Sequence, residues 1–167
     1  MKEAKVKIIK QRLLALLRLS LGWTFFWGFI DKVWGLGFAT LPEDAWLAGG
    51  SPTYGFLAFA TKGPLAGFYQ GMAGSPVVDW LFMMGLLLLG VSLLLGIGLR
   101  LASYGGPLLM LLLWSAALPP EHNPFMDEHI IYALLLFGMP YSNAGDYWGL
   151  GQWWAKQSLV KKFPILK

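Results

Sequence analysis

The chain has 167 residues, of which 56% are hydrophobic and 13% are charged, with a net charge of +4. Ordinary soluble domains carry about 25% charged residues, so the composition indicates a single membrane domain rather than a soluble one. Cysteine is absent, which excludes disulfides, Fe–S clusters and cysteine nucleophiles within the chain. The basic residues lie toward the chain ends, which favours a membrane topology over nucleic-acid binding.

The N-terminal segment, residues 1–12, is basic, and valine and isoleucine are interleaved with its lysines in KVKIIKQRLL. This pattern predicts a short amphipathic lead-in that lies on the membrane surface. A first membrane span is expected at 13–36. No small-residue cleavage site follows this long apolar run, so we expect it to remain in place as an anchor.

The first span is unusual because it contains ionisable residues. At helical spacing Trp23, Trp27, Asp31 and Trp34 share one face, and Lys32 follows Asp31 in the sequence. Ionisable side chains within a membrane are costly, so they usually face protein or a water-filled cavity and mark a functional site.

The connection that follows, residues 37–76, is apolar but interrupted by prolines and glycines. Two short helices are expected within it, at 53–61 and 65–72. Each is shorter than the roughly 20 residues that a bilayer crossing needs, so we expect both to lie on the outer membrane face.

A second span is expected at 77–99, where Ser92 and Gly96 have the spacing of a close helix contact. A third is expected at 101–118 and a fourth at 124–148, bent at Pro140 because proline removes a helix hydrogen bond.

The aromatic and basic tail after the fourth span predicts a C-terminal amphipathic helix anchored by Trp153 and Trp154. The expected fold is therefore an all-α membrane protein. It is a single domain, residues 1–167, with a bundle of four transmembrane helices.

With four spans, eleven of the 13 basic residues fall on one side of the membrane. They are Lys2, Lys5, Lys7, Lys10, Arg12, Arg18, Arg100, Lys156, Lys161, Lys162 and Lys167. Positive charge favours the cytoplasmic side, so the sequence predicts a plasma-membrane protein with both termini in the cytoplasm.

The outer side is expected to gather the main candidate site. Asp31, Lys32, Glu121 and His129 are its candidate catalytic residues. Its candidate ligand-binding residues are Trp23, Trp27, Trp34, His122, Asp127 and Tyr132. Quinone reduction needs an apolar slot beside groups that deliver protons, and this combination offers both. A purely structural alternative stays open, since Asp127 and Glu128 also suit the start of a helix and Asp31 can pair with Lys32 or His129.

The histidines and carboxylates before the fourth span match no metal-binding spacing, so neither a metal nor haem is expected. At the inner side Arg18, Arg100 and Asp146 form a candidate structural charge cluster. Asp146 is expected to accept a charge-assisted hydrogen bond from Arg18 or Arg100.

Three stretches of the chain resemble the DoxX family of four-helix membrane proteins. They are RLSLGWTFFWGFIDKVWGLGF, GLLLLGVSLLLGIGLRLAS and LPPEHNPFMDEHIIYALLL. The family includes the DoxD-type subunit of thiosulfate:quinone oxidoreductase. The resemblance implies a quinone-linked redox role at the outer face, with quinone as a mobile substrate and thiosulfate or a similar small donor, and with a partner subunit that shares the work.

Three functions remain open from the sequence. The chain is a redox subunit that reduces quinone, a non-catalytic subunit that anchors a larger complex, or a transporter or lipid-handling protein. The expected partners are the lipid bilayer and either a redox subunit or a second copy of the chain.

Overall fold

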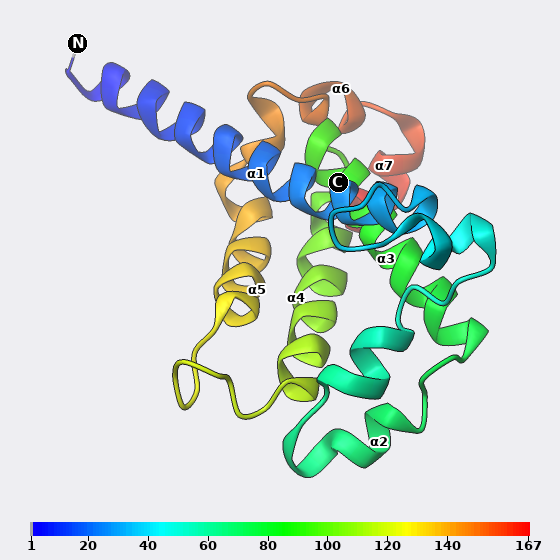
Figure 1. The fold of residues 1–167 in the computed structure, drawn as a ribbon. Helices are drawn as coiled ribbons and strands as arrows, with labels where there is room; N and C mark the ends of the chain where they lie inside the picture. The colour runs from blue at the N-terminus through cyan, green and yellow to red at the C-terminus, as the bar shows by residue number, and fades with distance from the viewer. Residues whose placement is uncertain (1) are drawn as a thin grey trace.

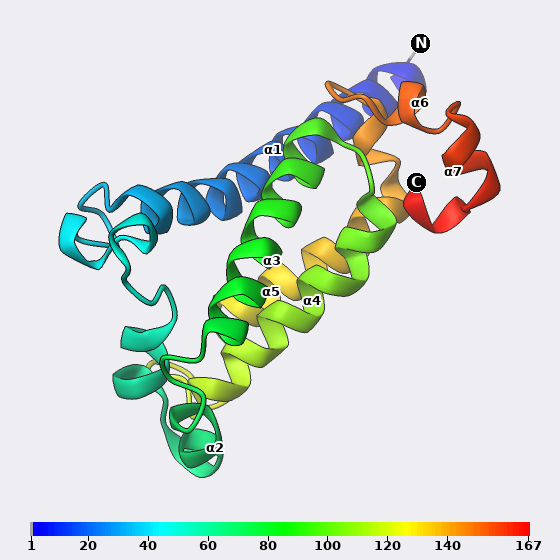
Figure 2. The same ribbon diagram turned by 90° about the vertical axis from the view of Figure 1, so that its right-hand side faces the viewer.

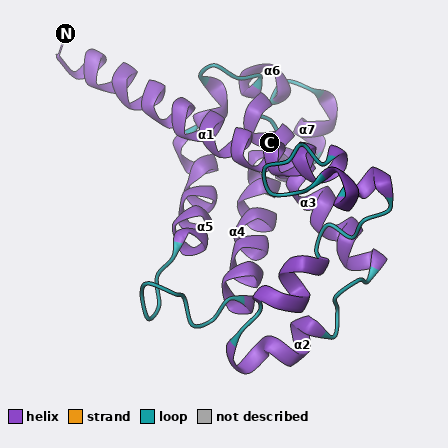
Figure 3. Ribbon diagram, viewed as in Figure 1, coloured by secondary structure: helices purple, strands orange, loops and turns teal. Residues whose placement is uncertain are grey.

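The regular secondary structure consists of helices, which are joined by loops (Figure 3). The computed structural model describes residues 2–167, and within that range there is no β-strand. The four longest helices are α1 (Lys2–Trp34), α3 (Pro76–Leu95), α4 (Leu99–Ala116) and α5 (Glu128–Gly138). The predicted all-α class is therefore confirmed.

Two helical segments are long and apolar enough to cross a membrane, Lys5–Trp34 and Pro76–Leu95. The first belongs to α1, which is one helix of 33 residues. The predicted basic lead-in is therefore not a separate element but the first turns of α1, which project away from the other helices (Figure 1). Their side chains from Lys5 to Lys10 are exposed.

The prediction of a long fourth helix at 124–148 is wrong. α5 has 11 residues and is about 16 Å long at 1.5 Å per residue, whereas the hydrocarbon core of a bilayer is about 30 Å thick. After Gly138 the chain tightens into a 3₁₀ turn, η5 (Met139–Ser142), which contains Pro140. Asn143 then adopts a left-handed φ of 51°, so the proline ends the helix instead of bending it.

α3 packs against both α1 and α4, and α4 packs in turn against α5, so that α4 lies between α3 and α5 in Figure 1. Met83 and Leu93 of α3 are fully buried between these helices. Gly90 allows the close approach of α1, because a Cβ there would lie 2.7 Å from Phe26 Cβ.

The predicted helix contact at Ser92 and Gly96 is instead a turn. Gly96 ends α3 with a left-handed φ of 71°, and Gly98 precedes α4 with a φ of 64°. Ser92 Oγ donates a hydrogen bond to the carbonyl of Ile97. The two glycines thus make the tight reversal between α3 and α4, since their conformation is unfavourable for residues with a Cβ.

The connection between α1 and α3 contains short helices near the predicted places. The region 53–61 contains a π-helical turn, η3 (Phe56–Ala60), and the region 65–72 contains α2 (Ala66–Gln70). Three short 3₁₀ segments complete the connection, and these are η1 (Pro42–Asp44), η2 (Trp46–Ala48) and η4 (Gly63–Leu65). Phe38, Phe59 and Phe68 are exposed along it.

The C-terminal segment folds back to the start of α4 (Figure 2). It comprises η6 (Ala144–Asp146), α6 (Gly151–Trp154), α7 (Ser158–Lys162) and η7 (Pro164–Leu166), so the single amphipathic helix predicted there is divided. The amide of Arg100 donates to the carbonyl of Lys167 at 2.9 Å. We call this end of the bundle, where α3 meets α4, the inner end, and the opposite end the outer end.

Candidate functional site

Asp31 lies near the end of α1 and is only 1% exposed. Its Oδ2 accepts a hydrogen bond from the amide of Ala39 at 2.9 Å, and its Oδ1 accepts a longer one from Phe38 at 3.4 Å. The chain reverses here through Gly35, whose φ is 63°. Both carboxylate oxygens are thus engaged in holding the loop that follows α1.

The other predicted site residues of α1 do not enclose a slot with Asp31. Trp23 and Trp34 are each 54% exposed. Trp27 is half-buried and its ring lies 5.6 Å from that of Trp23 and 5.1 Å from that of Phe38. Lys32 is half-buried in the last turn of α1, where a cation is favoured by the helix dipole.

Asp127 and His129 form a contact at the start of α5. Asp127 is the N-cap of α5, and its Oδ1 accepts hydrogen bonds from the amides of His129 at 3.0 Å and Ile130 at 3.4 Å. Its Oδ2 lies 3.0 Å from Nδ1 of His129. The side chains of His129 and Asp127 are 22% and 14% exposed, so the imidazole is oriented by a carboxylate while part of it still meets solvent.

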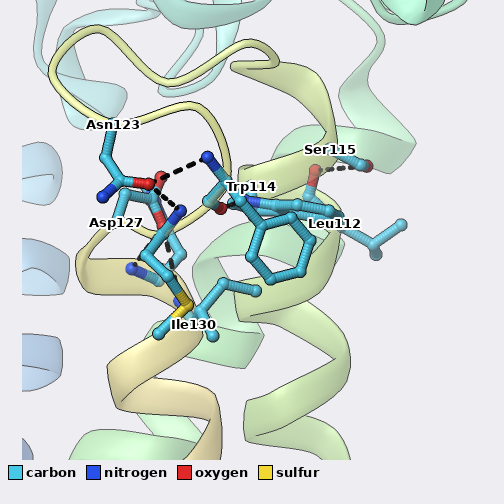
Figure 4. Close-up of polar contacts among 9 residues, drawn as sticks. Leu112, Trp114, Ser115, Asn123, Asp127 and Ile130 are labelled. Carbon is cyan, nitrogen blue, oxygen red and sulfur yellow. Dashed lines mark hydrogen bonds and ion pairs between the residues drawn. The ribbon is translucent and has the colours of Figure 1, made fainter.

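The loop before α5 is held by a second set of polar contacts (Figure 4). Asn123 Oδ1 accepts hydrogen bonds from the amides of Phe125 and Met126, at 2.9 and 2.8 Å. Trp114 of α4 donates its indole N–H to the carbonyl of Phe125 at 3.0 Å, and the two rings pack edge to face at 5.5 Å. These contacts tie the Asp127–His129 pair to α4.

The remaining predicted residues of this loop are less enclosed. Glu121 and His122 are exposed, and Tyr132, one turn into α5, is half-buried against the hydrophobic core. In the part of the chain that the structure describes, no group of three or more His, Asp or Glu side chains is arranged to hold a metal ion.

The structure does not bring the α1 residues together with those of α5. α1 packs along α3, whereas α5 packs along α4, and the end of α1 lies well apart from the outer ends of α4 and α5 in Figure 2. The expected outer cluster is therefore two separate sites, one around Asp31 and one around Asp127 and His129.

Arg18 occupies the inner end and is completely buried. Its Nη1 donates to the carbonyls of Leu93 and Leu94, the latter at 3.1 Å. Its Nη2 donates to the carbonyls of Tyr147 at 3.3 Å and Trp148 at 2.8 Å. One guanidinium thus joins α1 to the last turn of α3 and to the segment before α6, and the negative end of the α3 dipole favours its charge.

The predicted hydrogen bond from Arg18 or Arg100 to Asp146 is wrong. All of the bonds that Arg18 makes within the described residues go to backbone carbonyls, and Arg100 Nη1 donates to the carbonyl of Pro164 at 3.1 Å. The terminal carbonyls of α3 have no partner within their own helix, so they compete well for a buried guanidinium. Asp146 instead lines a small pocket beside Arg100.

Asp79 has a structural role that the sequence did not indicate. It is 5% exposed in the first turn of α3, and its Oδ1 accepts hydrogen bonds from Ser51 Oγ at 2.9 Å, Thr53 N at 3.1 Å and Thr53 Oγ1 at 2.6 Å. The sequence feature that could have indicated this role is an acidic residue in an apolar helix, together with hydrogen-bond donors at Ser51 and Thr53 in the preceding loop.

An apolar groove of about 370 Å³ lies between α3 and α4 toward the inner end. It is lined by Gly85, Leu89 and Ser92 of α3 and by Leu101 and Gly105 of α4, among others. None of the described residues of α1 lines this groove, so it is not the apolar slot that the sequence predicted beside Trp23, Trp27 and Trp34.

Comparisons of the chain with protein-family models, with curated proteins and with solved structures give no significant match.

Proposed function

We propose that this chain is an integral membrane subunit of a quinone-linked redox system, and that its own role is to anchor and assemble the complex. The anchoring role is supported by the buried carboxylates, which form hydrogen bonds that hold loops of the protein itself. Both oxygens of Asp31 hold the loop after α1, and Asp79 holds the loop before η3. These groups stabilise the fold and are engaged before any substrate arrives.

The proposed placement is a four-segment bundle in the plasma membrane, with both termini in the cytoplasm. Two apolar helical segments of 30 and 20 residues support it, as does the concentration of basic residues toward the inner end. α4 and the α5–η5 segment complete the bundle beside them. The redox association follows from the resemblance of the chain to the DoxX family.

Native mass spectrometry tests the anchoring role. The tagged chain is extracted from its own membranes in mild detergent, and a stoichiometric additional protein is expected with it. The His129→Gln variant is expected to retain that protein and the quinone-reducing activity of the complex. A chain that carries only lipid, or only a second copy of itself, would contradict the proposal.

Catalysis by this chain is a second candidate, favoured by the contact between Asp127 and His129. A carboxylate that orients an imidazole is a common arrangement for proton transfer. Quinone reduction to quinol consumes two electrons and two protons. Two thiosulfate ions would supply the two electrons as they couple to one tetrathionate, and His129 would pass the two protons from water to the quinone, one at a time. Loss of donor-dependent quinone reduction in His129→Gln, with the partner still bound, would favour this candidate over anchoring.

A further inference from the structure

The groove between α3 and α4 has the form of a site for a hydrocarbon chain. Its lining consists almost entirely of apolar atoms, and glycines on both helices, Gly85 and Gly105, leave the space open. A Cβ added at Gly105 would meet no atom within 4 Å. Its volume of about 370 Å³ lies within the range of known ligand pockets, roughly 300–1,000 Å³.

A second, smaller pocket with charged residues in its lining lies at the same end of the bundle. It has a volume of about 80 Å³ and is lined by Arg100, Asn143, Asp146 and Lys167, among others. Trp154 lines both the groove and the small pocket, and its indole N–H donates to the carbonyl of Leu166 at 2.5 Å. The two pockets therefore share one lining residue, which places them next to each other at the inner end.

The charge around the small pocket is positive. Two of its lining residues, Arg100 and Lys167, have cationic side chains, and one, Asp146, has a carboxylate. Lys156, Lys161 and Lys162 are exposed on the same C-terminal segment. Basic residues beside a membrane attract anionic headgroups, so charge complementarity selects an anionic lipid over a neutral one.

We propose that the inner end binds an anionic phospholipid, with an acyl chain in the groove between α3 and α4 and the phosphate beside Arg100 and Lys167. The proposal requires insertion in a membrane but is independent of the redox role. The α3–α4 turn and the folded-back C-terminal segment together build the site, and both are already fixed by backbone hydrogen bonds.

Lipid titration followed by native mass spectrometry tests this site. The delipidated protein in detergent is titrated with phosphatidylglycerol and, separately, with phosphatidylcholine that has the same acyl chains. With two cations at the site, we expect about tenfold or tighter binding of one phosphatidylglycerol. Inorganic phosphate at the same concentration is expected not to compete, because it lacks the chain that fills the groove.

Matched variants separate the two parts of the site. Gly105→Leu fills the groove and is expected to weaken the binding of both lipids, whereas Gly138→Leu, also a helical glycine with open space around it, is expected to leave binding unchanged. Lys167→Gln is expected to reduce only the preference for phosphatidylglycerol, with Lys62→Gln in the outer connection as its control.

The comparison of the two lipids on the unaltered protein does not depend on how any variant folds. Equal affinity for the two lipids would overturn the proposal. So would undiminished binding by Gly105→Leu, or a quinone as the stoichiometric occupant of the groove.

Discussion

The two ends of this bundle use their buried charges in opposite ways. At the inner end one cation, Arg18, bonds to carbonyls of two segments that lie more than fifty positions apart, at Leu93–Leu94 and at Tyr147–Trp148. At the outer end Asp79 reaches a single loop, at Ser51 and Thr53, and the other two acids hold only residues close to them in the sequence. Asp31 bonds to the loop directly after its helix, and Asp127 bonds to the first turn of the helix that it caps.

This difference follows from the chemistry of helix ends. The last carbonyls of α3 are acceptors without partners in their own helix, and a guanidinium has five donors in a rigid fork that can reach several of them at once. A carboxylate has only acceptors, so it serves the amides that are exposed where a helix begins or a loop turns. We therefore expect damage at the inner end to spread and damage at the outer end to remain local.

The largest effect is expected from Arg18→Gln. It leaves carbonyls of two segments, Leu93–Leu94 and Tyr147–Trp148, without their donor and should lower the free energy of unfolding by about 3–5 kcal/mol. Thermal unfolding in detergent measures this. Arg12→Gln is the control, because Arg12 is exposed and makes only a long contact of 3.5 Å to Tyr147. Equal melting temperatures for the two variants would show that the hydrogen bonds of Arg18 do not stabilise the inner end.

The second largest loss of stability is expected from Asp79→Asn. Its Oδ1 accepts hydrogen bonds from Ser51 and Thr53, and loss of the charge should cost about 2 kcal/mol. Limited proteolysis between residues 50 and 75 is expected to accelerate. Glu43 is an exposed acid in the same connection, so the control variant Glu43→Gln should leave the cleavage rate unchanged. Faster cleavage of Glu43→Gln would show that loss of any negative charge in this connection, and not loss of the Asp79 hydrogen bonds, accelerates proteolysis.

Asp31→Asn is expected to cost about 1–2 kcal/mol. One of the two amide contacts to residues 38 and 39 is lost, because an amide nitrogen cannot accept a hydrogen bond. The expected signature is faster hydrogen exchange in the loop after α1, with the inner end unaffected. Loss of quinone-reducing activity without any change in exchange would instead support catalysis at Asp31.

The smallest effect is expected from Asp127→Ala, which removes an N-cap and the partner of His129. Loss of such a cap typically costs about 1 kcal/mol, visible as a modest fall in melting temperature. Glu128→Gln is the control, since Glu128 is exposed in the same turn. If the control destabilised as much as the variant, the helix dipole rather than the cap would be responsible.

Hydrophobic periodicity predicted the helices in the first two-thirds of the chain well. The apolar runs that start near residues 13 and 77 correspond to α1 and α3, and Ser75–Pro76 marks the start of α3. The fourth helix was overestimated because the apolar residues continue after Gly138 while the backbone does not remain α-helical. Pro140 and the left-handed Asn143 determine that end.

The candidate site was harder to predict because it depends on which helices are neighbours. The sequence suggested that Asp127 suits the start of a helix, which depends on nearby residues alone, and Asp127 is the N-cap of α5. Whether Asp31 meets His129 depends on the packing of α1 against α3, which depends on close contacts such as Gly90 with Phe26. The partners of Arg18 could not be predicted because they are backbone carbonyls, which every residue possesses.

The central claim is that Arg18 at the inner end connects distant segments, whereas the acids at the outer end stabilise single loops. Amide hydrogen exchange, measured on the Arg18→Gln and Asp31→Asn variants side by side, tests this claim most directly. We predict faster exchange at the end of α3 and through residues 144–150 in Arg18→Gln, and faster exchange confined to residues 35–41 in Asp31→Asn. A confined change in Arg18→Gln, or a change that reaches the inner end in Asp31→Asn, would contradict the account.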